Sequence, residues 1–174
     1  MTKPSQVDLD YQHHILQGVS RTFALTIPQL PENLSKVVSN AYLLCRIADT
    51  IEDDKDMSLE KKKIAADQFI KVVAESSSAE EFAKALHSQL SPTSSSDERD
   101  LIGNSAAVLR ITHSFNPPQR QALERCIRLM AEGMARYQEA DVKNGLKDQA
   151  DMDQYCYFVA GVVGEMLTDL FCDY

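Results

Sequence analysis

The chain has 174 residues, 44% of them hydrophobic and 25% charged, a composition within the range of ordinary soluble globular proteins and a length sufficient for one substantial core. Its formal net charge of −8 argues against an electrostatic grip on nucleic acid, because 18 scattered Lys and Arg residues offer no basic face. We therefore expect a single domain over residues 1–174 that does not bind nucleic acid.

Four cysteines are spread along the chain without any C-x-x-C pair: Cys45, Cys126, Cys156 and Cys172. This spacing indicates neither a zinc site nor a disulfide framework, so we expect reduced thiols and a cytoplasmic location. The polar N-terminal residues 1–10 lack the apolar run of a signal peptide.

The longest apolar stretch covers residues 155–172 and has about the length of a membrane span. Glu165 and Asp169 interrupt its second half, so we interpret it as a buried helix.

Apolar residues recur at spacings of three and four, and strand signals are almost absent, which predicts an all-α fold. The last helix is apolar on nearly all sides, so we expect other helices to enclose it. Gly161 and Gly164 lie on one side of it, where the missing side chains permit close helix packing or leave room for a ligand, and we expect packing. Helices are predicted over residues 11–19, 32–54, 59–74, 78–90, 97–114, 117–140 and from 151 onward, with a short broken segment at 20–30, a loop at 91–96 and a polar connection at 141–150.

The predicted helix over residues 32–54 carries a stripe of polar side chains about 60° wide, at 100° per residue. The stripe contains Tyr42, Arg46, Asp49 and Asp53, with Glu52 at its edge. Like charges at i, i+3 and i+4 destabilise a helix by about a few tenths of a kcal/mol per pair, so a cation is expected to offset them. Hard oxygen ligands without His or Cys suit Mg²⁺ shared with phosphate oxygens.

A solvated acidic helix end is the alternative interpretation of this stripe, and spacing alone leaves both open. The acidic residues lie near the helix C-terminus, where the helix dipole disfavours them. That cost favours the functional interpretation. The adjacent pair His13 and His14 gives no comparable signal, because neighbouring helical side chains point about 100° apart, and we assign this pair no role.

Several strings resemble the squalene and phytoene synthase family, in the family's order and over most of the chain. They are VSRTF at 19–23, AYLLCRIADTIEDD at 41–54, GMA at 133–135 and YCYFVAGVVG at 155–164. The run D-T-I-E-D-D at 49–54 is similar to the first aspartate-rich motif of squalene synthases, which favours that branch over phytoene synthases.

The resemblance implies an all-α isoprenoid-synthase (prenyl-synthase) bundle around a central cavity, with residues 1–174 forming the N-terminal part of one catalytic domain. It further implies Mg²⁺-dependent, head-to-head condensation of two farnesyl diphosphates through presqualene diphosphate to squalene, with reduction by NADPH. A phytoene or dehydrosqualene synthase of the same family and a non-catalytic helical interaction protein are the alternatives.

Carried over residue by residue, the resemblance implies that Asp49, Glu52 and Asp53 bind Mg²⁺, with Asp49 and Asp53 also counted as catalytic. Arg21 and Arg46 would contact diphosphate or the phosphates of NADPH. Tyr155 would steer or deprotonate the cyclopropyl-forming cation, although a phenol with a pKa near 10 is a poor base, so diphosphate is an alternative base. The implied substrate-binding residues are Ser20, Phe23, Tyr42, Val159 and Val163.

Family members carry a second aspartate-rich motif on a later helix, and this sequence reaches Asp173 and Tyr174 before any such motif. We therefore expect a bundle that is incomplete at its C-terminus and inactive on its own. Uncovered apolar surface is expected to favour self-association, and the lipid product is expected to favour peripheral association with a membrane surface.

Overall fold

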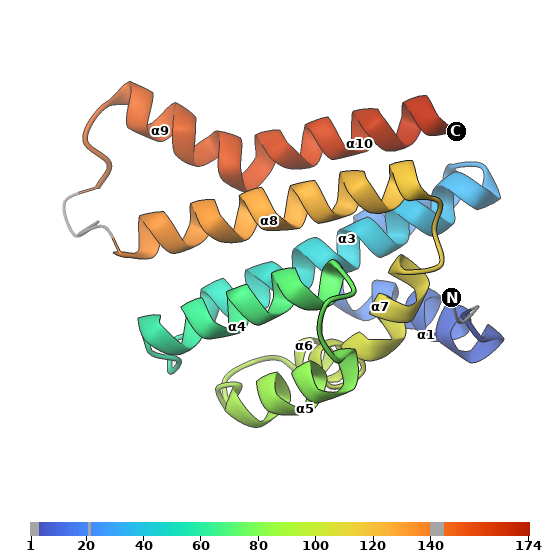
Figure 1. Cartoon of the computed structure of the whole chain (residues 1–174), viewed down its shortest axis with the longest axis horizontal. Coiled ribbons are helices and arrows are strands. Elements are labelled where there is room, and N and C mark those ends of the chain that lie inside the picture. The colour runs from blue at the N-terminus through green and yellow to red at the C-terminus, as the bar shows by residue number, and fades with distance from the viewer. Residues whose placement is uncertain (1–3, 21, 140–144) are drawn as a thin grey trace.

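The computed structural model describes residues 4–20, 22–139 and 145–174, and all regular structure within these ranges is helical (Figure 1). The predicted all-α class is therefore confirmed for the described residues. All four cysteines are free: Cys45 and Cys126 are buried, whereas Cys156 and Cys172 are exposed.

The helices follow the predicted order, with some different ends. Ser5 caps α1, because its hydroxyl accepts from the backbone N–H of Asp8 while the Asp8 carboxylate accepts from the backbone of Ser5, so α1 begins before residue 11. The elements are α1 (Gln6–Val19), α2 (Phe23–Thr26), the 3₁₀ turn η1 (Ile27–Gln29), α3 (Glu32–Asp53), α4 (Leu59–Val73), α5 (Ala79–Gln89), α6 (Ser96–Gly103), α7 (Ser105–Thr112), α8 (Pro117–Glu139), α9 (Gln149–Cys156), the π-helical segment η3 (Tyr157–Gly161) and α10 (Val162–Asp173).

The single helix predicted over residues 97–114 is wrong, because the chain breaks between α6 and α7 at Asn104, where φ is −110° and ψ is 15°. The side-chain amide of Asn104 donates to the carbonyl and the carboxylate of Asp100. Such local bonds compete with helix continuation, and the preceding Gly103 weakens the helix further.

Helix α3 lies at the centre of the fold and packs against α1, α4, α6, α7, α8 and α10. Leu44, Ile47 and Ile51 on its inner face are almost fully buried, as expected of an amphipathic helix that packs on a core. Figure 1 shows α8 between α3 and the rod formed by α9 and α10. Core contacts therefore hold α3 from several sides, and one of its faces stays partly accessible to solvent.

Helices α9 and α10 are enclosed less than predicted. Val162, Met166 and Leu170 are buried, whereas Tyr155, Tyr157 and other large apolar side chains of this rod are at least a third exposed. By length and composition the continuous helix Gln149–Asp173 would suffice to cross a membrane, with a mean hydropathy of 1.3 and 17% of the apolar window buried. The prediction of an enclosed helix is thus wrong for the described residues, because α10 packs mainly through the face that meets α8 and α3.

The predicted close packing at Gly161 and Gly164 is also wrong. A Cβ at Gly164 would meet nothing within 4 Å, and one at Gly161 would meet the Tyr157 side chain of the same helix. The close approach occurs at Gly133 on α8, where a Cβ would lie 2.2 Å from Cγ of Phe158. Gly133 therefore makes room for the aromatic side chain by which η3 packs on α8.

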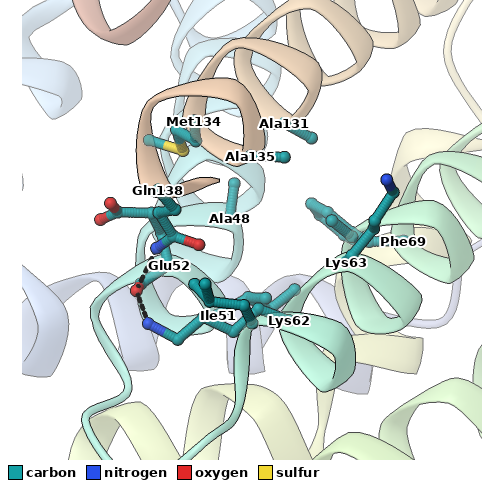
Figure 2. A pocket seen from close by; sticks show the side chains of 12 residues that line it. Ala48, Ile51, Glu52, Lys62, Lys63, Phe69, Ala131, Met134, Ala135 and Gln138 are labelled. Carbon is teal, nitrogen blue, oxygen red and sulfur yellow. Dashed lines mark hydrogen bonds between the residues drawn. The ribbon is translucent and has the colours of Figure 1, made fainter. Parts of the chain in front are cut away.

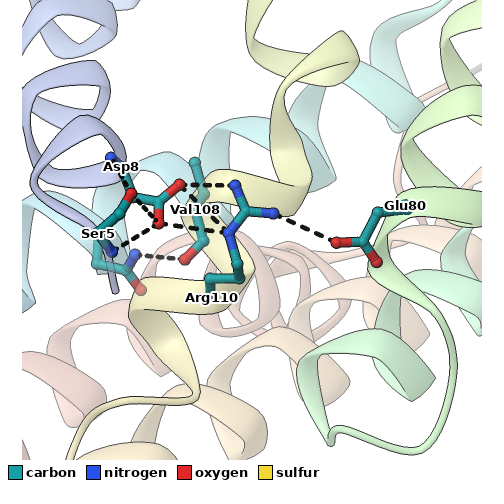
Figure 3. A network of polar contacts seen from close by, with 6 residues as sticks. Ser5, Asp8, Glu80, Val108 and Arg110 are labelled. Carbon is teal, nitrogen blue, oxygen red and sulfur yellow. Dashed lines mark hydrogen bonds and ion pairs between the residues drawn. The ribbon is translucent and has the colours of Figure 1, made fainter. Parts of the chain in front are cut away.

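An ion pair connects α1 to α7 (Figure 3). Arg110 donates through Nη2 to the Asp8 carboxylate at 2.6 Å and through Nη1 to Glu80 at 3.3 Å. Asp8 is 5% exposed. The hydrogen bond from Arg110, reinforced by those from Ser5, lowers the pKa of Asp8 below its ordinary value despite burial.

Candidate functional site

The polar stripe of α3 lies along the face that the core leaves accessible. Tyr42, Arg46, Asp49 and Glu52 are partly buried, and Asp53 is exposed. Burial raises the pKa of Asp49 to about 6, with the neighbouring Asp53 adding to the rise and Arg46 opposing it. Burial, with the adjacent Asp53, also raises the pKa of Glu52. Both carboxylates lose hydration on burial, and the adjacent Asp53 adds to the cost of their charged forms.

Asp54, the last acidic residue of the run at 49–54, has a structural role. Its Oδ1 accepts from the backbone N–H groups of Asp56 and Met57 at 3.0 and 2.9 Å, and its Oδ2 accepts from that of Ser91 at 2.7 Å. Asp54 is only 5% exposed. It therefore fastens the chain after α3 to the loop before α6 and does not point toward the stripe's carboxylates as a free ligand.

The end of α3 is held by side chains from two other helices. Lys62 of α4 and Gln138 of α8 both donate to the backbone carbonyl of Glu52, the latter at 2.7 Å, and Figure 2 shows the two donors converging on this oxygen. The adjoining hollow has a free volume of about 30 Å³, room for one or two water molecules. It is too small for a prenyl chain.

Arg46 is paired with a residue outside the resemblance. Its Nη2 donates to Oε1 of Glu98 on α6 at 2.5 Å, and its buried Nε has no hydrogen-bond partner. Arg46 also lowers the pKa of Asp49 by its charge. The guanidinium thus interacts with both Asp49 and Glu98.

Tyr155 of α9 lies close enough to the acidic end of α3 to be affected by its charges. Burial raises the pKa of its phenol, and the charges of Glu52, Asp53 and Asp49 raise it further. The Tyr155 ring meets that of Tyr137 edge-on, with centroids 5.2 Å apart, and the Tyr137 hydroxyl donates to the carbonyl of Asp151 at 3.1 Å. The structure therefore brings Tyr155 together with the three carboxylates, in its neutral form.

The remaining predicted residues form two groups, one around Tyr42 in the middle of α3 and one on η3 and α10. Tyr42 donates to the carbonyl of Val19 at 3.1 Å, and its ring lies 5.3 Å from that of Phe23, which is 53% exposed. Ser20 is buried and accepts from the backbone N–H of Phe23 at 3.0 Å. Val159 and Val163 are partly buried against the core. Arg21 lies outside the described residues.

The predicted ligands fit a water-rich magnesium site better than an all-protein cage. Within residues 4–20, 22–139 and 145–174, no group of three or more His, Cys, Asp or Glu side chains is arranged to hold one ion. Mg²⁺ commonly uses one or two carboxylates, with waters and phosphate oxygens completing its shell. The raised pKa values of Asp49 and Glu52 indicate where a cation would relieve uncompensated charge.

The all-helical architecture and its match to a solved squalene synthase structure place the described residues in the isoprenoid-synthase class of helical folds. The chain belongs to the squalene/phytoene synthase family, whose sequence profile matches residues 16–174.

Curated relatives include squalene synthase BSS of Botryococcus braunii, 32% identical over 173 residues that cover 97% of this chain and 34% of that protein. The squalene synthase of Eremothecium gossypii is 32% identical over 161 residues, covering 91% of this chain and 34% of that protein. A solved complex of TcSQS with the ligand BPH1237 superimposes with a TM-score of 0.75 at 29% identity, covering 97% of this chain and 45% of that one. The chain thus spans about a third of these curated relatives.

Sequence reasoning missed three residues of this region: Glu98, Tyr137 and Gly133. Glu98 stands in the sequence Ser95-Ser96-Asp97-Glu98, whose spacing is a capping-box signal, but nothing local to it predicts a contact with Arg46. Gly133 fell within a matched string without a stated role. Its partner Phe158 becomes evident only once α8 and η3 pack together.

Proposed function

We propose that the face formed by Arg46, Asp49, Glu52, Asp53 and Tyr155 is a magnesium-dependent diphosphate site of a squalene synthase. The complete protein joins two farnesyl diphosphates head to head through presqualene diphosphate, with reduction by NADPH. The observation that carries the proposal is the arrangement of Arg46, Asp49, Glu52 and Asp53 on the face of α3 that the core leaves accessible. Burial raises the pKa of Asp49 on this face to about 6, which supports the proposal.

Each residue has a distinct part in the proposed chemistry. Bound Mg²⁺ would supply Lewis-acid neutralisation of the departing diphosphate, held by Asp49 and Asp53, with Glu52 as a third carboxylate. Arg46 donates to phosphate oxygens, for which the guanidinium geometry is suited. Tyr155, whose pKa is raised, stays protonated and donates a hydrogen bond, which makes diphosphate the better base.

The apolar side chains surround the same space in this proposal. Phe23, Val159 and Val163 offer no nucleophile and exclude water from a carbocation. Ser20 and Tyr42 support that wall through their contacts with the backbone around residues 19–23. Arg21 and the NADPH site rest on the family resemblance alone, so no chemical step is derived from them.

Binding of farnesyl thiodiphosphate, a slowly reacting analogue, tests the proposal on the chain as it stands. We expect calorimetric binding that requires Mg²⁺ and that falls at least about tenfold in D49N and D53N. D67N, at an exposed acidic residue of α4, is the matched control and should bind as the unmodified chain does. Binding that is independent of Mg²⁺, or unaffected by D49N and D53N, would contradict the proposal.

The proposal extends to the product and the cellular location. We propose a cytoplasmic protein whose lipid product brings it to a membrane surface. Incubation of the complete protein with farnesyl and geranylgeranyl diphosphates, with and without NADPH, distinguishes squalene from dehydrosqualene or phytoene as the product. Squalene formed only with NADPH is the expected result.

A further inference from the structure

Glu98 contacts the proposed site from a different part of the chain. It lies on the first turn of α6, 52 residues beyond Arg46, and it lines a cleft together with Thr50, Asp53 and Asp54 of the α3 end. This cleft has a free volume of about 180 Å³, room for several water molecules. Glu98 therefore stands beside the carboxylate face and outside the aspartate-rich motif.

The Glu98 carboxylate is fixed independently of Arg46. Its Oε2 accepts from the backbone N–H of Ser95 at 3.0 Å and from the Ser95 hydroxyl at 2.9 Å, and the Ser95 hydroxyl in turn accepts from the backbone N–H of Glu98. This is the capping box of α6. The other oxygen of the Glu98 carboxylate, Oε1, accepts from Arg46. The N-terminus of α6 therefore holds this acceptor in place.

The Arg46 side chain has donor capacity that Glu98 does not use. The pair is formed through Nη2 alone, and Nε is buried without a partner. A donor without an acceptor raises the free energy of the unliganded site, so a phosphate oxygen that reaches this guanidinium is bound more favourably. Since 31% of the Arg46 side chain is exposed, an unpaired guanidinium there would sample many rotamers and lose this freedom on binding.

We propose that Glu98 is a positioning residue, which holds the Arg46 guanidinium at the carboxylate face of α3 before a diphosphate group arrives. The inference rests on the proposed function and adds to it a residue that the aspartate-rich motif does not contain. Glu98 itself does not touch the diphosphate. It acts by removing rotamer freedom from Arg46 in advance, which lowers the cost of binding.

The opposite role would be competition, in which the negative charge of Glu98 occupies Arg46 and repels the anion. The two roles predict opposite changes in the affinity for an anion when Glu98 is replaced by alanine. Under competition, E98Q and E98A both bind an anion more tightly. Under positioning, E98A binds more weakly, whereas E98Q keeps an acceptor oxygen for Arg46 and retains most of the affinity.

Calorimetric titration of the 174-residue chain with inorganic pyrophosphate at saturating Mg²⁺ tests the proposal. We expect E98A to weaken binding about tenfold and E98Q to remain within about threefold of the unmodified chain. E98D keeps the charge but withdraws the carboxylate by one methylene, and it should also weaken binding. E98D stands in if E98A loses its helical circular dichroism.

Three controls separate positioning from a general effect on α6. S95A removes the hydroxyl that helps to fix the Glu98 carboxylate but keeps the backbone N–H contact, so it should weaken binding less than E98A does. E165Q removes a charge from the exposed Arg125–Glu165 pair, whose atoms lie 2.6 Å apart, and should have no effect. In the R46Q background, adding E98A should change nothing, because Glu98 acts through Arg46.

Tighter binding by E98A and E98Q, or unchanged binding by E98A, would overturn the role of Glu98 while leaving the proposed function intact. A further loss of affinity on adding E98A to R46Q would also overturn it. No Mg²⁺-dependent pyrophosphate binding by the unmodified chain would instead overturn the proposed function, and the role of Glu98 with it.

Discussion

At the scale of single residues, the acidic run at 49–54 contains side chains with different tasks. Asp49 lies on the open face of α3 with its pKa raised to about 6, whereas Asp54 accepts three backbone hydrogen bonds in the loop beyond. Thr50 is buried, and its hydroxyl donates to the carbonyl of Arg46. Proximity in sequence therefore does not imply a shared function.

The raised pKa of Asp49 predicts a conflict between stability and binding. Because the native state holds this proton more tightly than the unfolded chain, its stability falls as pH rises from about 4 to about 6, and the penalty is fully present at pH 7. Without Mg²⁺, D49N should therefore be more stable than the unmodified chain at pH 7, by about 1–3 kcal/mol. Urea unfolding at pH 7 and pH 4 measures the difference, which should vanish at the lower pH.

The same urea unfolding experiment, repeated with Mg²⁺, tests whether Asp49 binds the metal. Mg²⁺ should stabilise the unmodified chain against urea at pH 7 and leave D49N unchanged, because ligand binding to the native state alone raises stability. A D49N chain less stable than the unmodified one at pH 7 would show that Asp49 is a structural residue.

At the scale of helices, the contacts that hold α1 against the bundle are polar as well as apolar. The Asp8 carboxylate accepts from Arg110 of α7 and also from the backbone N–H of Ser5 at the start of its own helix, so one buried carboxylate serves two elements. Glu80 contacts the same guanidinium from α5, but 69% of its side chain is exposed. The two carboxylates differ mainly in burial.

This difference predicts unequal effects of two matched substitutions. D8N should lower the free energy of unfolding at pH 7 by about 1–3 kcal/mol, whereas E80Q should change it by less than about 1 kcal/mol. The pKa of Asp8 is lowered in the native state, so its stabilising effect is present above its ordinary pKa and is lost as pH falls below that value. Thermal unfolding at pH 7 and pH 3 checks both points, and equal effects of D8N and E80Q at pH 7 would contradict them.

The sequence predicted the helices where periodicity and caps agreed. The prediction over residues 32–54 is confirmed as α3 (Glu32–Asp53), and that over residues 59–74 as α4 (Leu59–Val73). The prediction over residues 97–114 was wrong because the apolar period continues through Asn104, while the local hydrogen bonds to Asp100 that stop the helix leave no periodic signal.

The candidate site was predictable only as far as it lies on one helix. Helical spacing placed Arg46, Asp49 and Asp53 on one face, and the resemblance added Tyr155. Their magnesium and diphosphate roles remain predictions. The contact of Arg46 with Glu98, 52 residues away, depends on how α6 packs against α3, which no local pattern encodes.

At the scale of the whole molecule, buried residues are distributed unevenly among the helices. Helices α3 and α7 lie within the bundle, and α7 has seven buried residues among its eight. In contrast, α9 has no buried residue, and α10 has three: Val162, Met166 and Leu170. Few buried contacts mean a low free energy of local opening.

Hydrogen exchange should reveal this difference. We expect the amides of α9, η3 and α10 to exchange at least about tenfold faster than those of α3 and α7 in the unmodified chain, because local opening releases little buried surface. Mass spectrometry of peptic peptides resolves these segments. Protection in α10 equal to that in α3 would mean that the exposed side of the rod is covered in solution.

The backbone carbonyl of Glu52, which accepts two hydrogen bonds, affects how strongly the carboxylates around it bind a cation. Terminal turns of helices ordinarily fray, yet Lys62 and Gln138 anchor this one to α4 and α8. A turn that does not fray has less disorder to surrender when a cation arrives, so more of the attraction between ion and carboxylate is retained as affinity. Lys62 and Gln138 thus stiffen this turn, and they also favour the ionised form of the Glu52 carboxylate, Lys62 by its charge and Gln138 by a hydrogen bond.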